Sequence, residues 1–323
     1  MAKVFLKLIA LVFTAVCSTA VLAQNYPTKP IKIVVPFPPG GATDIIGRAV
    51  AERLQAVFNR PVIVENKAGA SGNIGVAEVV RSAPDGYTLV MGAAQTLTIN
   101  HQLFDNMGFL PQRDLAPIVV VASVPNVLVV ANRLPAKNLQ EFIALVKANP
   151  GKFSSGSSST GGTPHLTLEM FKSTVGAAIV HIPYKGSAPA LQDLAGGQIE
   201  MMFDNLPAAL PLIAGGRVRP IGVTTLKRTA SAPDIPTFDE MGLKGFESQG
   251  WFGLLAPVGT PPAILERLNA EVNKMIQTPE FRDRLVKAGA DPVGGSIDEF
   301  RQRLKSETDR WGRVIKAANV KAE

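Results

Sequence analysis

Cysteine is nearly absent from this chain of 323 residues, and the single one, Cys17, lies in an apolar segment near the N-terminus. The rest of the chain therefore has no disulfide, no thiol nucleophile and no cysteine-ligated metal. The three histidines lack the spacing of metal ligands. Enzyme motifs are missing too: the serine-rich segment 156–160 fails G-x-S-x-G at its last position, and H-E-x-x-H does not occur. The sequence implies no cofactor.

Basic residues exceed acidic ones, 33 to 26, but they are scattered and are not interleaved with aromatic residues. This pattern argues against a nucleic-acid partner. It permits a mild preference for small anions.

The N-terminal segment has the layout of a secretion signal. Lys3 and Lys7 give the segment a positively charged start, and residues 5–16 otherwise form a mainly apolar run. The segment ends at Ala23, a small residue of the kind that a signal peptidase requires. A membrane anchor is the weaker alternative, because the run is shorter than the ~20 apolar residues that span a bilayer. We therefore expect residues 1–23 to be a signal peptide, Gln24 to begin the mature chain, and the protein to be exported to the periplasm.

The remaining chain alternates short apolar runs with amphipathic segments, which indicates an α/β protein with parallel, doubly wound sheets. We expect a first lobe at 24–124, a second lobe at 125–247, and a return to the first lobe at 248–323. Runs at 115–124 and 127–130 are broken by Pro125, which suits a crossing between lobes. The expected strands lie at 31–35, 62–64, 87–91, 152–155, 179–182, 199–203, 220–223 and 251–256. The expected helices lie at 45–59, 74–82, 139–147, 164–175, 188–194 and 207–213. Further helices are expected after 261, and Ser296 with Glu299 forms a capping box there.

A Pro/Gly corner at 36–41 joins the first strand to the first helix. Gly40 and Gly41 leave backbone N–H groups accessible, and the helix that follows adds its own unpaired N–H groups and partial positive charge. No Walker lysine or serine stands nearby, so a carboxylate fits this corner at least as well as a phosphate.

A second polar segment at 154–163 mixes hydroxyl groups with glycines and precedes Pro164, which is well placed in the first turn of a helix. Its hydroxyl and N–H groups are suited to a second carboxylate or to a bridging water. Asp204 follows an apolar strand and would accept hydrogen bonds either from a ligand or from a neighbouring loop. Ser71 lies in a glycine-rich helix entry whose G-x-x-G-x-x-G spacing differs from that of a dinucleotide site.

Several motifs together resemble the Bug family, the periplasmic solute-binding receptors of tripartite tricarboxylate transporters. They are PFPPGGATD at 36–44, ENKAGASGNIG at 65–75, PDGYTL at 84–89, SSTGGTPHL at 158–166, and PYKG at 183–186 followed by APAL at 188–191. The resemblance implies a two-lobed type II periplasmic-binding-protein fold with mainly parallel sheets flanked by helices. It also implies a small carboxylate ligand in the interlobe cleft, transient docking on a membrane permease, and a monomer.

In that family, loops after the first strand of each lobe hold the ligand, which here corresponds to 37–43 and 157–163. Gln95 stands where many relatives carry another polar residue. The candidate ligand-binding residues are Phe37, Gly40, Gly41, Thr43, Ser71, Gln95, Ser157, Ser158, Thr160, Gly161, Thr163 and Asp204.

Two other functions remain open at this stage. One is a receptor for a different uptake system, such as an amino-acid or inorganic-anion transporter. The other is an exported hydrolase that uses the serine-rich loop. A ligand screen separates the receptors from each other, and turnover of esters would reveal the hydrolase.

Overall fold

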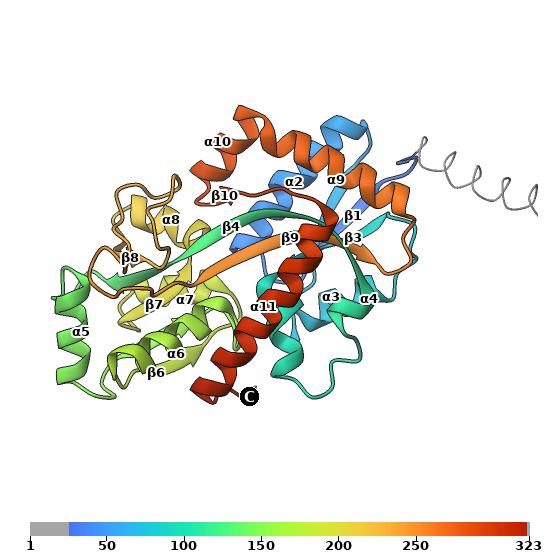
Figure 1. Cartoon of the computed structure of the whole chain (residues 1–323). Coiled ribbons are helices and arrows are strands. Elements are labelled where there is room, and N and C mark those ends of the chain that lie inside the picture. The colour runs from blue at the N-terminus through green and yellow to red at the C-terminus, as the bar shows by residue number, and fades with distance from the viewer. Residues whose placement is uncertain (1–25, 322–323) are drawn as a thin grey trace, which may run out of the picture.

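The computed structural model describes residues 26–321 as a mixed α/β protein built on one curled sheet of ten strands (Figure 1). The expected signal peptide, 1–23, lies outside the described residues. The strands are β1 (Ile31–Val35), β2 (Val62–Asn66), β3 (Thr88–Ala93), β4 (Leu115–Ala131), β5 (Ser154–Ser157), β6 (Val180–Pro183), β7 (Met201–Asn205), β8 (Val218–Val223), β9 (Gln249–Pro257) and β10 (Asp291–Pro292). The α-helices are α2 (Ala42–Phe58), α3 (Asn73–Val80), α4 (Pro111–Asp114), α5 (Leu139–Ala148), α6 (Thr163–Val175), α7 (Ser187–Ala195), α8 (Leu206–Ala214), α9 (Pro262–Gln277), α10 (Pro279–Lys287) and α11 (Ile297–Ala318). Two short 3₁₀-helices, η1 (Ala70–Gly72) and η3 (Asn100–Gln102), and one short π-helix, η2 (Gln95–Ile99), complete the order.

The strand order is β2-β1-β3-β9-β4-β7-β5-β6, with β8 and β10 also paired to β4. Pairing is parallel within the two strand–helix repeats, β2-β1-β3 and β6-β5-β7. The strands that join the repeats, β4 and β9, run antiparallel to their neighbours. We call β2, β1, β3, β10, β9 and the first part of β4 the first half of the sheet. The second half is the last part of β4 with β5 to β8.

The expected break at Pro125 is wrong, because β4 runs without interruption through both halves. Pro125 is the last β4 residue that pairs with β9, opposite Gln249, and Asn126 is the first that pairs with β7. Proline lacks an N–H to donate to a ladder. It is tolerated here because β4 changes partners at this residue. Figure 1 shows β4 and β9 side by side as the connection between the halves.

Most expected elements are present, with ends shifted by one to three residues. Helix α2 ends where Asn59 adopts the left-handed conformation, before Pro61. The predicted capping box at Ser296 and Glu299 opens α11 with both of its hydrogen bonds. Strand β5 is displaced toward the C-terminus, because Gly156 and Ser157 pair with Ile182 and Pro183 of β6. Ser157 is therefore a strand residue, and the second loop begins at Ser158.

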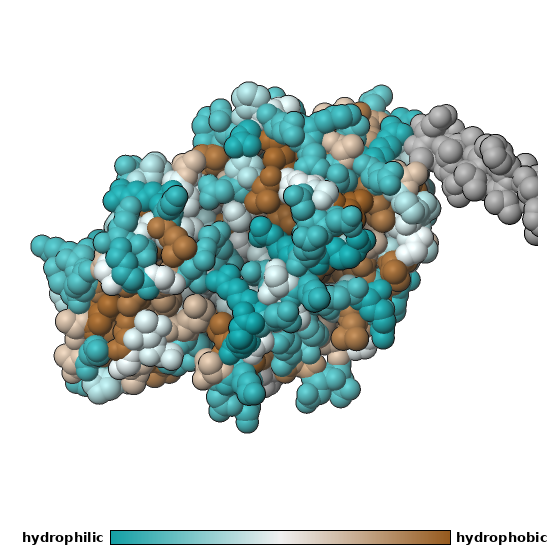
Figure 2. All heavy atoms as spheres, viewed as in Figure 1, coloured by the Kyte–Doolittle hydropathy of each residue, from teal (hydrophilic) through white to brown (hydrophobic). Residues whose placement is uncertain are grey.

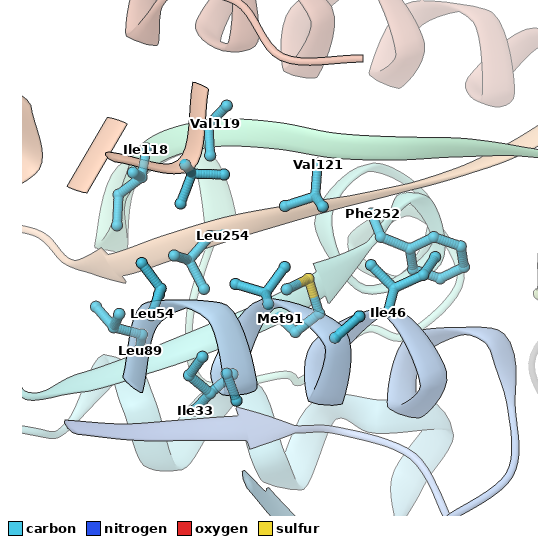
Figure 3. Close-up of a cluster of buried hydrophobic side chains, with 14 of the residues drawn as sticks. Ile33, Ile46, Leu54, Leu89, Met91, Ile118, Val119, Val121, Phe252 and Leu254 are labelled. Atoms are coloured by element: carbon cyan, nitrogen blue, oxygen red, sulfur yellow. The ribbon is translucent and has the colours of Figure 1, made fainter. Parts of the chain in front are cut away.

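Apolar side chains fill both faces of the sheet. In the first half, α2, α9 and α10 cover one face, where Ile46 and Leu54 meet Ile33, Leu89 and Met91 (Figure 3). The opposite face packs against α3 and the first part of α11. In the second half, α5 and α6 cover one face, and α7 and α8 cover the other.

Helix α11 crosses from the first half to the second (Figure 1). Its last turns carry Trp311 and Ile315 onto Leu166 of α6 and Ile99 of η2. The face of the molecule seen in Figure 2 is mainly hydrophilic, with apolar residues in scattered patches. Such scattered apolar residues are usual on the surface of folded domains.

Candidate functional site

A cavity of about 50 Å³ lies between the two halves, at the carboxyl ends of parallel strands. This is where open α/β sheets place ligands. The volume is several times the ~10–15 Å³ that one water needs, so the cavity suits a few waters or a small polar group. It is lined by Phe37, Pro38, Gly41, Ala42, Thr43, Ala93, Ala94, Gln95, Ser158, Thr163, Pro164, Gly186, Ser187, Asn205, Gly250, Trp251 and Phe252.

Four helices begin at this cavity, and their N-cap residues are Gly41 (α2), Gly162 (α6), Gly186 (α7) and Asn205 (α8). None of these four has a side-chain capping hydrogen bond, whereas α5, α10 and α11 are capped by Asn138, Thr278 and Ser296. Backbone N–H groups of a first turn have no partner within the helix, and they carry partial positive charge. Their convergence gives the cavity the chemistry that suits an anion.

Charged side chains are absent from the described residues that line the cavity, which contribute hydroxyl, amide and apolar groups. An anion would therefore be held by hydrogen bonds and helix dipoles instead of a counter-ion. Such charge-assisted hydrogen bonds are stronger than those between neutral groups.

Asp44 holds the first loop in shape. Its Oδ2 accepts the Gly40 N–H at 3.0 Å, and its Oδ1 accepts the Asn66 amide at 2.9 Å and the Arg48 guanidinium at 2.9 Å. Burial opposes ionisation, but the hydrogen bonds from Arg48, Gly40 and Asn66 outweigh it and lower the pKa of Asp44. The Gly40 N–H is therefore used inside the protein, and Gly40, with φ of 86°, serves the turn.

Two stacked histidines support the second loop. The rings of His165 and His181 are parallel within 7°, with centroids 3.8 Å apart. His165 Nδ1 accepts the Gly161 N–H at 3.0 Å, and His181 Nε2 lies 2.6 Å from the Ser157 hydroxyl. Burial, and secondarily Lys172, lowers the pKa of His165 to about 4. Burial and the neighbouring His165 lower the pKa of His181 to about 3, so both rings are neutral near pH 7.

Side chains of the first half bond the second loop across the mouth of the cavity. Gln95 Nε2 donates to the Thr160 carbonyl oxygen at 3.0 Å, and Ser159 Oγ donates to Gln95 Oε1 at 2.9 Å. Ser71 Oγ donates to the same Thr160 carbonyl oxygen at 3.3 Å. These bonds hold the two loops together and close the mouth of the cavity in this structure.

The structure places the predicted residues in three groups. The residues that line the cavity are Phe37, Gly41, Thr43, Gln95, Ser158 and Thr163. Ser71 and Thr160 line an outer hollow of about 590 Å³, whose wall shares Phe37, Pro38, Ser158 and Gly186 with the cavity. The residues outside the cavity lining are Gly40, Ser157, Gly161 and Asp204.

Sequence reasoning missed Ser187 and Asn205, which contribute a hydroxyl and an amide to the cavity. A signal for each exists: the glycine at 186 opens a helix, and Asn205 directly precedes a Leu-Pro helix start. Asp204 lies behind both residues and is 1% exposed. Its Oδ1 accepts the Ser187 hydroxyl at 3.0 Å and the Asn205 N–H at 2.9 Å.

Within residues 26–321, no helix is long and apolar enough to cross a membrane. Over the same range, no group of three or more His, Cys, Asp or Glu side chains is arranged to hold a metal ion.

Comparison with known proteins gives close matches. The model of the "Tripartite tricarboxylate transporter family receptor" family matches residues 46–320. Protein BugT of Bordetella pertussis is 37% identical over 309 residues, which cover 95% of each chain. The structure of R. palustris Rpa4515 with adipate has a TM-score of 0.90 at 38% identity and covers 92% of this chain and 99% of that one. MatC from Rhodopseudomonas palustris with bound malate has a TM-score of 0.83 at 30% identity, over 90% of this chain and 100% of that one.

These similarities confirm the resemblance drawn from the motifs and the expected α/β binding-protein fold. They also confirm a solute-binding receptor in place of an enzyme, because the matching family consists of transporter receptors.

Proposed function

The chain belongs to the family of tripartite tricarboxylate transporter receptors, and we propose that it binds a small organic carboxylate whose carboxylate group enters the cavity between the two halves of its sheet, with the rest of the ligand directed toward the adjoining outer hollow. The observation that carries this proposal is the convergence of four N-termini without side-chain caps on a cavity whose described lining has no charged side chain. A cation would meet partial positive charge there, and a carboxylate would meet donors. Two similar proteins were solved with carboxylates, one with adipate and one with malate.

In this proposal the backbone N–H groups at 41–43 receive one carboxylate oxygen pair, and Ser187, Asn205 and Thr163 contact it from the second half. Gln95 and Ser158 complete the cavity wall, and Phe37 packs against the ligand's apolar part. Ser71 and Thr160 act from the outer hollow, directly or through water. Gly40, Ser157 and Gly161 shape the two loops from behind.

We further propose that residues 24–124 and 248–323 form one lobe and 125–247 the other, with β4 and β9 as the hinge. A ligand shifts an open–closed equilibrium only if it binds the two states with different affinity. Donors from both halves line this cavity, so a bound carboxylate favours closure. After export and removal of residues 1–23, the protein would act in the periplasm as a monomer. Its closed form would then dock on a membrane permease.

A matched pair of ligands tests the proposal. We expect adipate, malate or another small acid in a panel to increase the free energy of unfolding by RT ln(1 + [L]/Kd), which is seen as a melting temperature that rises with ligand concentration. Adipamide, which has the length of adipate without its charges, should bind at least tenfold more weakly. Amino acids in the panel test a different uptake system, and p-nitrophenyl esters test the hydrolase. Equal binding of adipate and adipamide, or stabilisation by none of the acids, would contradict a carboxylate receptor.

A further inference from the structure

One acidic side chain is buried immediately behind the proposed carboxylate site. Asp204 is the second-last residue of strand β7 and is 1% exposed. Its Oδ1 accepts two hydrogen bonds, from the Ser187 hydroxyl and the Asn205 N–H, and its Oδ2 is buried with no partner among the described residues. Both donors line the cavity and lie at the starts of α7 and α8.

This position creates an electrostatic conflict when Asp204 is ionised. A carboxylate placed between two helix N-termini takes up the partial positive charge that would otherwise act on a ligand. It also repels a second carboxylate across a low-dielectric interior, where charges are weakly screened. Protonation of Asp204 removes both effects.

Ser187 transmits the state of Asp204 to the cavity, because its hydroxyl has a single proton. An ionised Asp204 attracts that proton and leaves only oxygen lone pairs facing a ligand. A protonated Asp204 is a weaker acceptor, so the Ser187 hydroxyl is free to turn and donate to the ligand.

We propose that Asp204 is a positioning residue that couples carboxylate binding to proton uptake: the site holds its ligand with Asp204 protonated, and it releases the ligand more easily when Asp204 ionises. This inference rests on the proposed function, since it requires an anion in the cavity.

The surroundings of Asp204 support this coupling. Burial raises its pKa to about 7, against the opposing hydrogen bonds from Asn205 and Ser187. On the elements packed against β7, the titratable or charged side chains are His165, Glu169 and Lys172 of α6 and Asp193 of α7; β4, β5 and α8 contribute none. The pKa of His165 is lowered to about 4, so this ring does not titrate between pH 6.5 and 8.5.

Isothermal titration calorimetry with adipate, between pH 6.5 and 8.5, tests the coupling on the mature protein. We expect the affinity to fall about twentyfold over this range, because Asp204 must be protonated before adipate binds. Close to one proton should be taken up per adipate bound at pH 8, as measured from the dependence of the binding heat on the ionisation enthalpy of the buffer. Asp204→Asn should bind adipate at pH 8.5 as tightly as the wild type does at pH 6.5, with no proton uptake. Asp193→Asn, the same change at the far end of α7, should keep the wild-type profile.

The possible results distinguish a failure of the proposed Asp204 role from a failure of the proposed carboxylate-binding function. If no acid of the panel binds at any pH, both are overturned; if adipate alone fails to bind, the tightest-binding acid of the panel takes its place in this experiment. Adipate binding with a flat pH profile and no proton uptake would overturn the role of Asp204 alone. If Asp204→Asn does not fold, NMR of the Asp204 γ-carboxyl carbon in the wild type measures its pKa directly. A pKa near 7 that increases when adipate is bound supports the coupling. A pKa below 5 overturns it.

Discussion

Gln95 and Thr160 are joined by a hydrogen bond of 3.0 Å across the mouth of the cavity, although 65 positions separate them in the chain. The Gln95 amide also accepts the Ser159 hydroxyl at 2.9 Å, so one side chain of the first half fixes two residues of the second loop. Direct contacts between the loops therefore stabilise the closed arrangement, in addition to the stabilisation that we propose for a bound ligand. Both contributions can be separated by mutation.

Ser159→Ala removes one of these contacts without changing a residue that lines the cavity. We expect the affinity for the best-binding acid to fall by about 1 kcal/mol, roughly fivefold, because a neutral hydrogen bond of the closed form is lost. Calorimetry measures this change. Ser173→Ala, at an exposed position of α6, is the control and should bind as the wild type does. An unchanged affinity in Ser159→Ala would show that the Gln95 contact contributes nothing to closure.

Gly41→Asp tests the anion corner. Gly41 has φ of −81°, and a Cβ added there meets only the Pro38 carbonyl oxygen at 4.0 Å, so a side chain is accommodated. The new carboxylate would sit at the N-cap of α2, where its negative charge repels a ligand carboxylate and takes up the partial positive charge of the helix. We expect affinity to fall at least a hundredfold, ~2.7 kcal/mol. Gly41→Asn has the same shape without the charge and should lose far less; equal losses in the two variants would remove the electrostatic explanation.

Thr163→Trp tests closure itself. Thr163 is 5% exposed, and its Oγ1 lies 3.3 Å from where a Cβ on Gly250 of β9 would stand. An indole cannot fit between α6 and β9 in the closed form, so the cleft should stay open. Small-angle scattering should then show no ligand-induced decrease in radius of gyration, whereas the wild type and the exposed control Thr174→Trp should become more compact. Compaction of Thr163→Trp like that of the wild type would argue against hinge closure.

Thr163→Ala gives a smaller, graded effect. It removes the Thr163 hydroxyl from the cavity lining but keeps the backbone that accepts the Thr167 hydroxyl at 2.6 Å. We expect binding to weaken by about 0.5–1.5 kcal/mol, the contribution of a neutral hydrogen bond. A loss as large as that of Gly41→Asp would assign Thr163 a larger role than one hydroxyl can have.

His181→Asn tests the pH dependence of the second loop. The folded pKa of His181, about 3, lies below the ordinary value of 6.5, so between these values the unfolded chain binds more protons and stability falls as pH falls. The variant lacks this titration, so its stability deficit relative to the wild type should shrink by about 2 kcal/mol between pH 7.5 and pH 5. Guanidinium unfolding at both pH values measures it. Ser157→Ala keeps the histidine, so its stability deficit relative to the wild type should change less between the two pH values. If the stability deficit of His181→Asn does not vary with pH, a neutral buried ring at His181 is contradicted.

Local sequence signals predicted the parts of the fold that depend on local physics. The Pro/Gly corner before α2 and the capping box at Ser296 are examples, because a few neighbouring residues determine each. The prediction at Pro125 was wrong because the effect of a proline in a strand depends on the strands beside it. Only the folded sheet shows that β4 changes its pairing partner at this residue.

The site shows the same division. Gly41 and Thr43 were identifiable because a strand–helix corner forms an anion site by itself. The sequence did not show that Gly40, unlike Gly41 and Thr43, lies outside the cavity lining. Its N–H donates to the side chain of Asp44, and that contact is visible only in the folded loop. Ser187 and Asn205 reach the cavity only through the topology of the second half, where β5, β6 and β7 end at one edge.

A crystal structure of the mature protein with the tightest-binding acid of the panel tests the central claim most directly. We expect a ligand carboxylate within hydrogen-bond distance of backbone N–H groups at 41–43 and of Ser187 or Asn205, with the Gln95–Thr160 bond retained. A carboxylate bound outside this cavity, or held by donors of only one half of the sheet, would contradict a receptor that closes around its ligand.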